Sequence, residues 1–179
     1  MNTGKIFESE IKDSLDEWNK NNRNDIVYYH RIPDPPQSFN QDSNGLRFSN
    51  KNPYDIFIVK TIDWENKIGS FIALELKSKK INSLSFNLDK NIKGTFDIKY
   101  HQIQGLKEVY DKGGKAFFLF NFRKENLTYK ICINNFLKFV ESTDKKSINI
   151  KDIIEFGGIL IPQELKKIKY RYDVSKIWE

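Results

Sequence analysis

The chain has 179 residues, of which 39% are hydrophobic and 14% aromatic, and its formal net charge is +6. This composition excludes a disordered chain, and the length suits a single domain spanning residues 1–179 with a sizeable core. One cysteine, Cys132, and two histidines, His30 and His101, exclude an internal disulfide and a zinc site built from several histidines. The positive charge permits an acidic partner such as nucleic acid without requiring one.

The sequence shows no sign of membrane insertion or export. No apolar run reaches the roughly 20 residues that a helix needs to cross a bilayer. Residues 1–10 are polar and include acids, which is unlike a secretory signal. We therefore expect a cytoplasmic protein.

The first half of the chain predicts one helix followed by three strands. Apolar residues recur at steps of three and four over residues 3–20, which is typical of an amphipathic helix. Residues 26–32 are rich in β-branched and aromatic side chains and predict a strand. Residues 33–52 are rich in Pro, Asn and Ser and predict a long loop. Two further strands follow over 54–60 and 70–77, joined by a turn.

The second half predicts a mixture of helices and strands. Residues 81–98 have no clear period, and residues 166–178 form a basic, aromatic tail. The expected elements between them are a helix over 100–110, strands over 115–122 and 127–133, and short helices over 135–141 and 151–156. This order predicts an α/β domain, with a mixed β-sheet flanked by α-helices.

An acid and a base two residues apart in an apolar run are the most informative local feature. In the strand 70–77, Glu75 and Lys77 point to the same face, roughly 6.8 Å apart along the chain. Asp55 stands at the start of the neighbouring strand. Two acids and a lysine are the groups needed for metal-assisted hydrolysis of a phosphodiester. The acids would hold Mg²⁺ or Mn²⁺, and the lysine would stabilise the attacking hydroxide.

The same pair also fits a simpler interpretation, a surface salt bridge on an exposed strand edge. Three features favour the site over this alternative. Asp55 opens a neighbouring strand, Glu8 lies on a helix that can dock nearby, and His101-Gln102 begins another helix after a basic segment.

Several motifs, in their order along the chain, resemble the PD-(D/E)xK nuclease superfamily and, within it, the RecU-type Holliday junction resolvases of bacteria and phages. The resemblance covers about residues 4 to 175. It is carried by Gly4–Glu8, Asp55, Leu74–Lys77, Ser85-Phe86, Tyr100–Ile103, Lys146–Ile148 and Lys169-Tyr170. It implies a restriction-endonuclease-like fold and a metal-dependent endonuclease that resolves four-way DNA junctions in recombination and repair.

The resemblance also implies roles for individual residues. Asp55 and Glu75 would be the metal ligands, for Mg²⁺ or Mn²⁺, and Lys77 the catalytic lysine. Gln102 would lie beside the metal or the scissile phosphate, or else only cap its helix. Glu8 would support the site from the first helix, or else pair with a nearby lysine.

Two departures from the family pattern bear on function. Pro53 stands where the family usually has a threonine, so one hydroxyl contact is lost or replaced. The family's basic stalk corresponds to residues 33–52, which are short and carry few basic side chains. The stalk is therefore expected to be shortened or absent, which bears on junction selectivity more than on nuclease chemistry.

DNA contacts are expected from basic side chains that follow or flank the candidate site. These are Lys79, Lys80, Lys93, Lys99 and His101, which would bind phosphate and contribute salt dependence without reading sequence. A homodimer is expected because two matched nicks need a two-fold symmetric pair of sites. The alternatives are a general structure-specific or restriction-like nuclease, and a non-catalytic DNA-binding module with the same fold.

Overall fold

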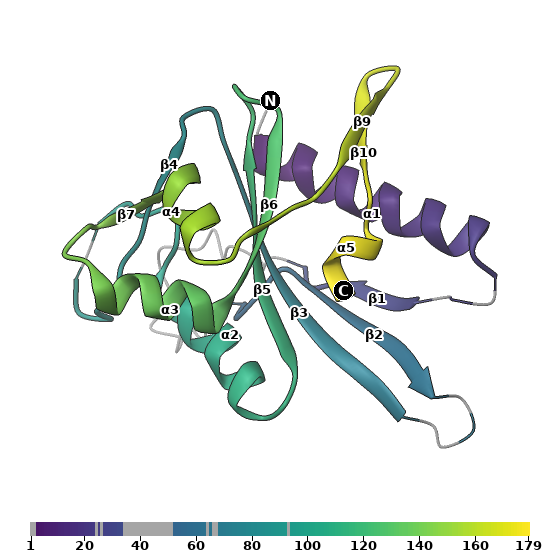
Figure 1. The fold of residues 1–179 in the computed structure, drawn as a ribbon, viewed down its shortest axis with the longest axis horizontal. Helices are drawn as coiled ribbons and strands as arrows, with labels where there is room; N and C mark the ends of the chain where they lie inside the picture. Colours follow the sequence, from purple (N-terminus) through teal and green to yellow (C-terminus); the bar gives the residue numbers. More distant parts are fainter. Residues whose placement is uncertain are drawn as a thin grey trace, which may run out of the picture.

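The computed structural model describes residues 3–23, 25, 27–33, 52–63, 65, 68–92 and 94–179. At its centre is a six-stranded sheet in the order β1-β2-β3-β5-β6-β8 (Figure 1). These strands are β1 (Val27–Arg31), β2 (Ile56–Asp63), β3 (Ile68–Lys79), β5 (Lys115–Phe122), β6 (Leu127–Cys132) and β8 (Ile159–Leu160). Strands β3 and β5 are parallel, and the other neighbours are antiparallel. Most of the loop predicted over 33–52 lies outside the described residues.

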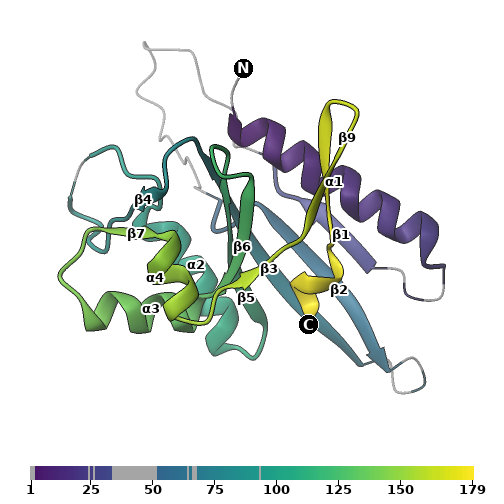
Figure 2. The same cartoon turned by 45° about the horizontal axis from the view of Figure 1, so that its top comes forward.

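Helices cover both faces of this sheet, which confirms the predicted α/β class. They are α1 (Thr3–Asn21), α2 (Tyr100–Asp111), α3 (Ile133–Ser142), α4 (Ile150–Glu155) and α5 (Ser175–Trp178). In Figure 2, α1 lies on one side of the strands and α2, α3 and α4 lie on the other. None of the helices in the described part of the chain is long and apolar enough to span a bilayer.

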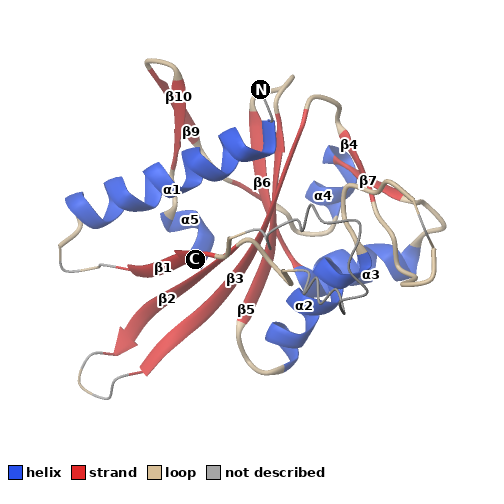
Figure 3. Cartoon of the chain, turned by 180° about the vertical axis from the view of Figure 1, so that it is seen from behind, coloured by secondary structure: helices blue, strands red, loops and turns tan. Residues whose placement is uncertain are grey.

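Two hydrophobic clusters, one on each face, divide along the central strand β3. Ile72, Leu74 and Leu76 pack with α1, whereas Ala73 belongs to the cluster formed with α2, α3 and α4. This alternation is the period-two pattern expected of a strand. The alternation places Glu75 on the face that α2 covers, where Gln102 of α2 contacts it. Its strand β3 lies in the middle of the sheet (Figure 3).

Short strands outside the main sheet were not predicted. In the irregular segment 81–98, β4 (Ser83–Ser85) pairs with β7 (Ser147–Asn149). In the basic tail, β9 (Gln163–Lys166) and β10 (Lys169–Tyr172) form a hairpin.

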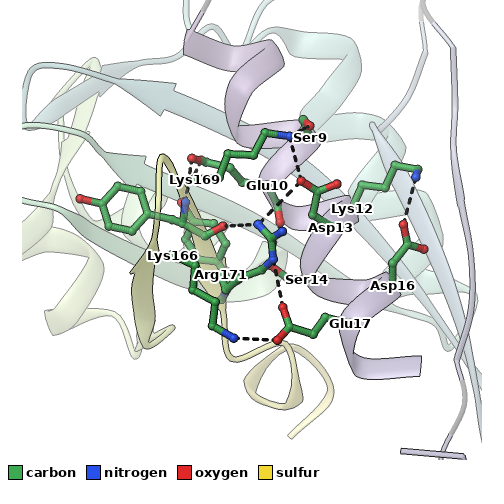
Figure 4. A network of polar contacts seen from close by, with 12 residues as sticks. Ser9, Glu10, Lys12, Asp13, Ser14, Asp16, Glu17, Lys166, Lys169 and Arg171 are labelled. Atoms are coloured by element: carbon green, nitrogen blue, oxygen red, sulfur yellow. Dashed lines mark hydrogen bonds and ion pairs between the residues drawn. The ribbon is translucent and has the colours of Figure 1, made fainter. Parts of the chain in front are cut away.

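The β9–β10 hairpin docks on α1 through a polar network (Figure 4). Lys169 Nζ lies 2.9 Å from Asp13 Oδ2, and Arg171 Nε lies 3.0 Å from Glu17 Oε2. The buried Glu10 accepts a hydrogen bond from the backbone N–H of Tyr170. Acids on one helix face and bases on the hairpin therefore hold the C-terminal segment against the first helix.

Candidate active site

Asp55 is fixed at the start of β2 by its own backbone. Its N–H donates to the carbonyl of Leu74 at 2.9 Å, and its carbonyl accepts from the N–H of Ile32 at 2.8 Å. Its side-chain Oδ2 accepts from the N–H of Leu76 at 2.7 Å. The Asp55 carboxylate is therefore held beside β3 between Glu75 and Lys77.

Glu75 is the most buried of the predicted site residues, with 1% of its surface exposed. Its Oε1 lies 2.8 Å from Lys77 Nζ and also accepts from Gln102 Nε2. Its Oε2 is buried and has no hydrogen-bond partner among the described residues. The salt bridge of the simpler interpretation is present, but it lies on a central strand and not on an exposed edge.

Burial makes both carboxylates hard to ionise. Burial raises the pKa of Glu75 to about 8, the Asp55 charge acts in the same direction, and Lys77 opposes it. Burial likewise raises the pKa of Asp55, while the bond from Leu76 and the charge of Lys77 oppose the rise. A bound divalent cation would act against this shift, because an opposite charge beside the two carboxyl groups favours their ionised form and lowers the pKa of each.

The donor set fits a hard divalent cation. In the described ranges, no group of three or more His, Cys, Asp or Glu side chains is placed to hold a metal. Mg²⁺, however, is commonly bound by one or two carboxylates and keeps several waters. Asp55 and Glu75 would supply those carboxylates, and the unpartnered Oε2 of Glu75 is an oxygen left available for a ligand bond.

Gln102 caps its helix, which was one of the two roles that the sequence left open, and it also contacts Glu75. It lies in the first turn of α2, where its Oε1 accepts from the N–H of Lys99 at 2.9 Å. Its Nε2 donates to Oε1 of Glu75. The same side chain therefore closes the start of the helix and contacts the candidate metal ligand.

Glu8 lies near the site, with a partner that sequence reasoning missed. Arg31 Nε in β1 donates to Glu8 Oε2 at 2.7 Å, whereas the alternative interpretation of Glu8 was an ion pair with a lysine. Glu8 raises and Arg31 lowers the pKa of Asp55. The signal in the sequence was a basic residue, Arg31, near the end of the strand predicted over 26–32.

The predicted DNA-contacting residues differ in their surroundings. Lys79 forms an ion pair with Asp97, a residue the sequence did not single out. Lys80 and Lys99 are exposed, and His101 is half-buried. Lys93 lies outside the described residues.

Pro53 packs against α2. A Cβ at Gly105 would lie 2.4 Å from Pro53 Cβ and 2.8 Å from its carbonyl oxygen, so only glycine allows this approach. Pro53 therefore contributes close packing two residues before Asp55, in place of the family's hydroxyl group.

The arrangement of a buried acid and a lysine on β3, with a second acid directly before the neighbouring strand β2, matches the residue pattern of the PD-(D/E)xK class of nucleases. The family model of RecU, recombination protein U, matches residues 2–176. The chain therefore belongs to the RecU family, as its motifs predicted, and this is a family of Holliday junction resolvases.

The other comparisons concern solved structures and curated proteins. One similar structure is that of Archaeoglobus fulgidus Hjc, a Holliday junction resolvase from an archaeal hyperthermophile. It is 14% identical, with a TM-score of 0.47, over 83% of this chain and 91% of the other. No curated protein matches the sequence.

Proposed function

We propose that residues 1–179 form one nuclease domain that cleaves four-way DNA junctions by paired, metal-dependent nicks. The observation that carries the proposal is the arrangement around Glu75. Its carboxylate is buried beside Asp55 and Lys77, and one oxygen has no partner in the described part of the chain. Action on DNA in recombination and repair also supports a cytoplasmic location.

Each side chain has a separate task in this mechanism. Asp55 and Glu75 would hold Mg²⁺ or Mn²⁺, which when bound supplies Lewis-acid stabilisation of the charge that develops on the phosphate. Lys77 donates to Glu75 Oε1 and lies on the same strand face, where its ammonium group would stabilise the attacking hydroxide and contact the scissile phosphate. Gln102 holds the orientation of the Glu75 carboxylate from α2.

Cleavage assays on several DNA substrates test this function. The wild-type protein with Mg²⁺ should place two symmetric nicks in a four-way junction, and a chelator should abolish them. Lys77→Ala and Asp55→Asn should each lower the cleavage rate by about 10²- to 10³-fold, since each removes a group that acts on the transition state. Lys107→Ala is the matched control, because Lys107 on α2 pairs only with the exposed Asp111 at one helical turn.

Other outcomes would point to the alternatives. Equal cleavage of flap, duplex and junction substrates would indicate a general structure-specific nuclease. Binding to the junction without cleavage at any Mg²⁺ or Mn²⁺ concentration would leave only a DNA-binding module.

A homodimer is supported by an aromatic row on β1, β2 and β3. Tyr28 contacts Phe57, and Phe57 stacks on Phe71 with ring centroids 5.6 Å apart. Tyr28 is 61% exposed and Phe71 36% exposed. Contiguous apolar groups on a sheet face mark an interaction surface, and a two-fold pair would supply the second active site.

Light scattering after size-exclusion chromatography tests the dimer. The wild-type protein should have twice the mass of one chain, and Phe71→Glu should shift it toward the monomer because a charge replaces an apolar contact. Phe71→Leu is the matched control and should remain dimeric. A monomeric wild-type protein at micromolar concentration would contradict the proposal.

A further inference from the structure

The segment between β3 and α2, the helix that carries Gln102, is closed by contacts among Lys79, Ser85 and Asp97, which we call the polar clamp. Strand β3 ends at Lys79, two residues after Lys77. The chain comes back to Lys79 at Asp97, which forms an ion pair with it shortly before α2 begins. The irregular segment between these two points carries β4 and no other regular strand or helix among its described residues.

Asp97 gathers three donors at one carboxylate oxygen. Its Oδ2 accepts from the N–H and the Oγ of Ser85, both at 2.8 Å, and it pairs with Lys79 Nζ. In return, the N–H of Asp97 donates to Ser85 Oγ at 3.1 Å. Burial raises the pKa of Asp97, but the bonds from Lys79 and Ser85 outweigh it, so the net pKa is lowered. The clamp therefore holds a carboxylate that is ionised at neutral pH.

Backbone contacts continue from the clamp to the active site. The N–H of Ile98 donates to the carbonyl of Ser85 at 2.9 Å, and Ile98 is buried. The next residue, Lys99, donates its N–H to Gln102 Oε1, and Gln102 Nε2 reaches Glu75. The backbone from Asp97 to Lys99, together with the hydrogen bonds of Gln102, thus connects Asp97 to the candidate metal ligand.

The residue after Ser85 anchors the clamp in the core. Phe86 is 2% exposed and makes edge-on ring contacts with Phe136 and Phe139. The Ser85-Phe86 pair, which the proposed reaction does not otherwise use, therefore has a physical role. The serine binds Asp97, and the phenylalanine fixes the serine to α3.

We propose that Asp97 is a positioning residue for phosphodiester cleavage. Through Ser85 and Lys79 it sets the start of α2 relative to β3, and so keeps Gln102 bonded to Glu75. This inference rests on the proposed function for its effect on rate. The ion pair also means that Lys79 serves the clamp, with its charge balanced by Asp97.

Single-turnover cleavage and junction binding, measured separately, test the proposal. Asp97→Ala and Ser85→Ala should lower the cleavage rate by about 10- to 100-fold, because a small displacement of a positioned group costs this much. The Kd for the junction should stay within about threefold, since neither side chain is proposed to touch DNA. Asp97→Asn should recover much of the rate, because its amide oxygen can still accept from Ser85.

Asn87→Ala is the matched control for these variants. Asn87 lies in the same segment and bonds to the backbone of Asp89 and Ile92 through its side chain, without touching Asp97. It should cleave at the wild-type rate. Wild-type cleavage by Asp97→Ala, or a loss confined to binding, would overturn the proposal.

Hydrogen exchange in the metal-free protein supplies a readout independent of activity. The N–H groups of Gln102 and Ile103 donate to the carbonyl of Lys99 in the first turn of α2. Asp97→Ala should lower their protection by about tenfold or more while β5 keeps its protection. Unchanged protection would overturn the proposed positioning role of Asp97. A wild-type protein that never cleaves DNA would overturn only the proposed function.

Discussion

At the scale of single residues, Glu75 and Lys130 show two different reasons for burying an ionisable side chain. Glu75 has one oxygen without a partner in the described structure, and burial raises its pKa. A purely structural carboxylate would have both oxygens bonded, because an unpaired buried polar atom costs free energy. The unpartnered oxygen of Glu75 supports its proposed role as a metal ligand.

Lys130, in β6, is buried, and its ammonium group has hydrogen-bond partners. Its Nζ donates to the carbonyls of Lys176 and Ile177 at 2.6 and 3.3 Å, and it lies 4.8 Å from the centre of the Phe117 ring. Burial, with a smaller contribution from the charge of Lys115, lowers the pKa of Lys130 to about 8. Lys130 therefore holds α5 in place and has no role in the proposed reaction.

The lowered pKa of Lys130 predicts a pH-dependent stability. Between pH 8 and 10.5, Lys130 binds more protons in the unfolded chain than in the folded one. The contribution of Lys130 to the unfolding free energy therefore rises with pH over this range, and it is least favourable below pH 8. The unfolding free energy of wild type minus that of Lys130→Met should increase by at most about 3 kcal/mol between pH 7 and 10.5. Urea unfolding followed by circular dichroism measures it. A difference that does not change with pH would contradict this prediction.

Glu8 and Arg31 predict an effect on cleavage. Glu8→Gln removes the Glu8 charge that pairs with Arg31 and that acts on the pKa of Asp55. We expect a cleavage rate lower by about tenfold, because the Asp55 carboxylate would lose its fixed surroundings. Lys12→Ala on the same helix breaks only an exposed pair with Asp16 and should leave the rate unchanged. Equal rates for Glu8→Gln and wild type would indicate that Glu8 is only structural.

At the scale of elements, the approach of α2 to Pro53 is set by Gly105. Alanine would normally favour a helix by about 1 kcal/mol relative to glycine. Here its Cβ would overlap Pro53, whose carbonyl oxygen and Cα lie within 3 Å of that position, so the helix and the Asp55 segment must separate. The local gain in helix propensity is therefore smaller than the packing loss.

Gly105→Ala should lower both stability and activity. We expect a loss of about 1–3 kcal/mol in unfolding free energy, the usual range for overpacking, and a slower cleavage rate. Gly69→Ala in β3 is the control, since a Cβ there would meet its neighbours only at ordinary contact distances of 3.5 and 3.6 Å. Retained activity in Gly105→Ala would show that Asp55 does not depend on this contact. Thermal unfolding and the junction assay give the two measurements.

Elements with a clear period were predicted well, and short paired strands were not. The strand 115–122 was predicted with its observed bounds, and the helix 100–110 to within one residue at its end. Strands β4 and β7 have three residues each and lie far apart in sequence. Strand β10, which pairs with β9, is held by Glu10 and Ser14 of the first helix. No local pattern reveals such partners, because their stability comes from tertiary contacts.

At the scale of the whole molecule, residue spacing predicts only the part of the proposed site that a hairpin creates, and the roles of Gln102 and Glu8 were predicted from the family resemblance alone. Asp55 and Glu75 meet because β2 and β3 are consecutive antiparallel strands. Gln102 lies on α2, in the connection between the parallel strands β3 and β5, and the clamp at Asp97 brings it to Glu75. No residue spacing in the sequence reveals this contact. Arg31 arrives because β1 pairs with β2 across a long intervening segment. The first arrangement is local, and the others depend on the completed sheet.

The placement of exposed lysines around the site predicts how DNA binding depends on salt. Lys80 follows the catalytic strand and Lys99 precedes α2, so both lie at the ends of elements that carry site residues and both are exposed. Each phosphate contact that is lost should reduce the slope of log K against log salt concentration by about 0.9 for duplex DNA. Lys80→Ala and Lys99→Ala should each show this change in fluorescence-anisotropy titrations, and the double variant should show about twice the change. Lys20→Ala is the control, because Lys20 is exposed near the far end of α1, about 18 Å along the helix from Glu8. An equal change in Lys20→Ala would indicate binding driven by net charge alone, and not by a surface centred on the catalytic strand.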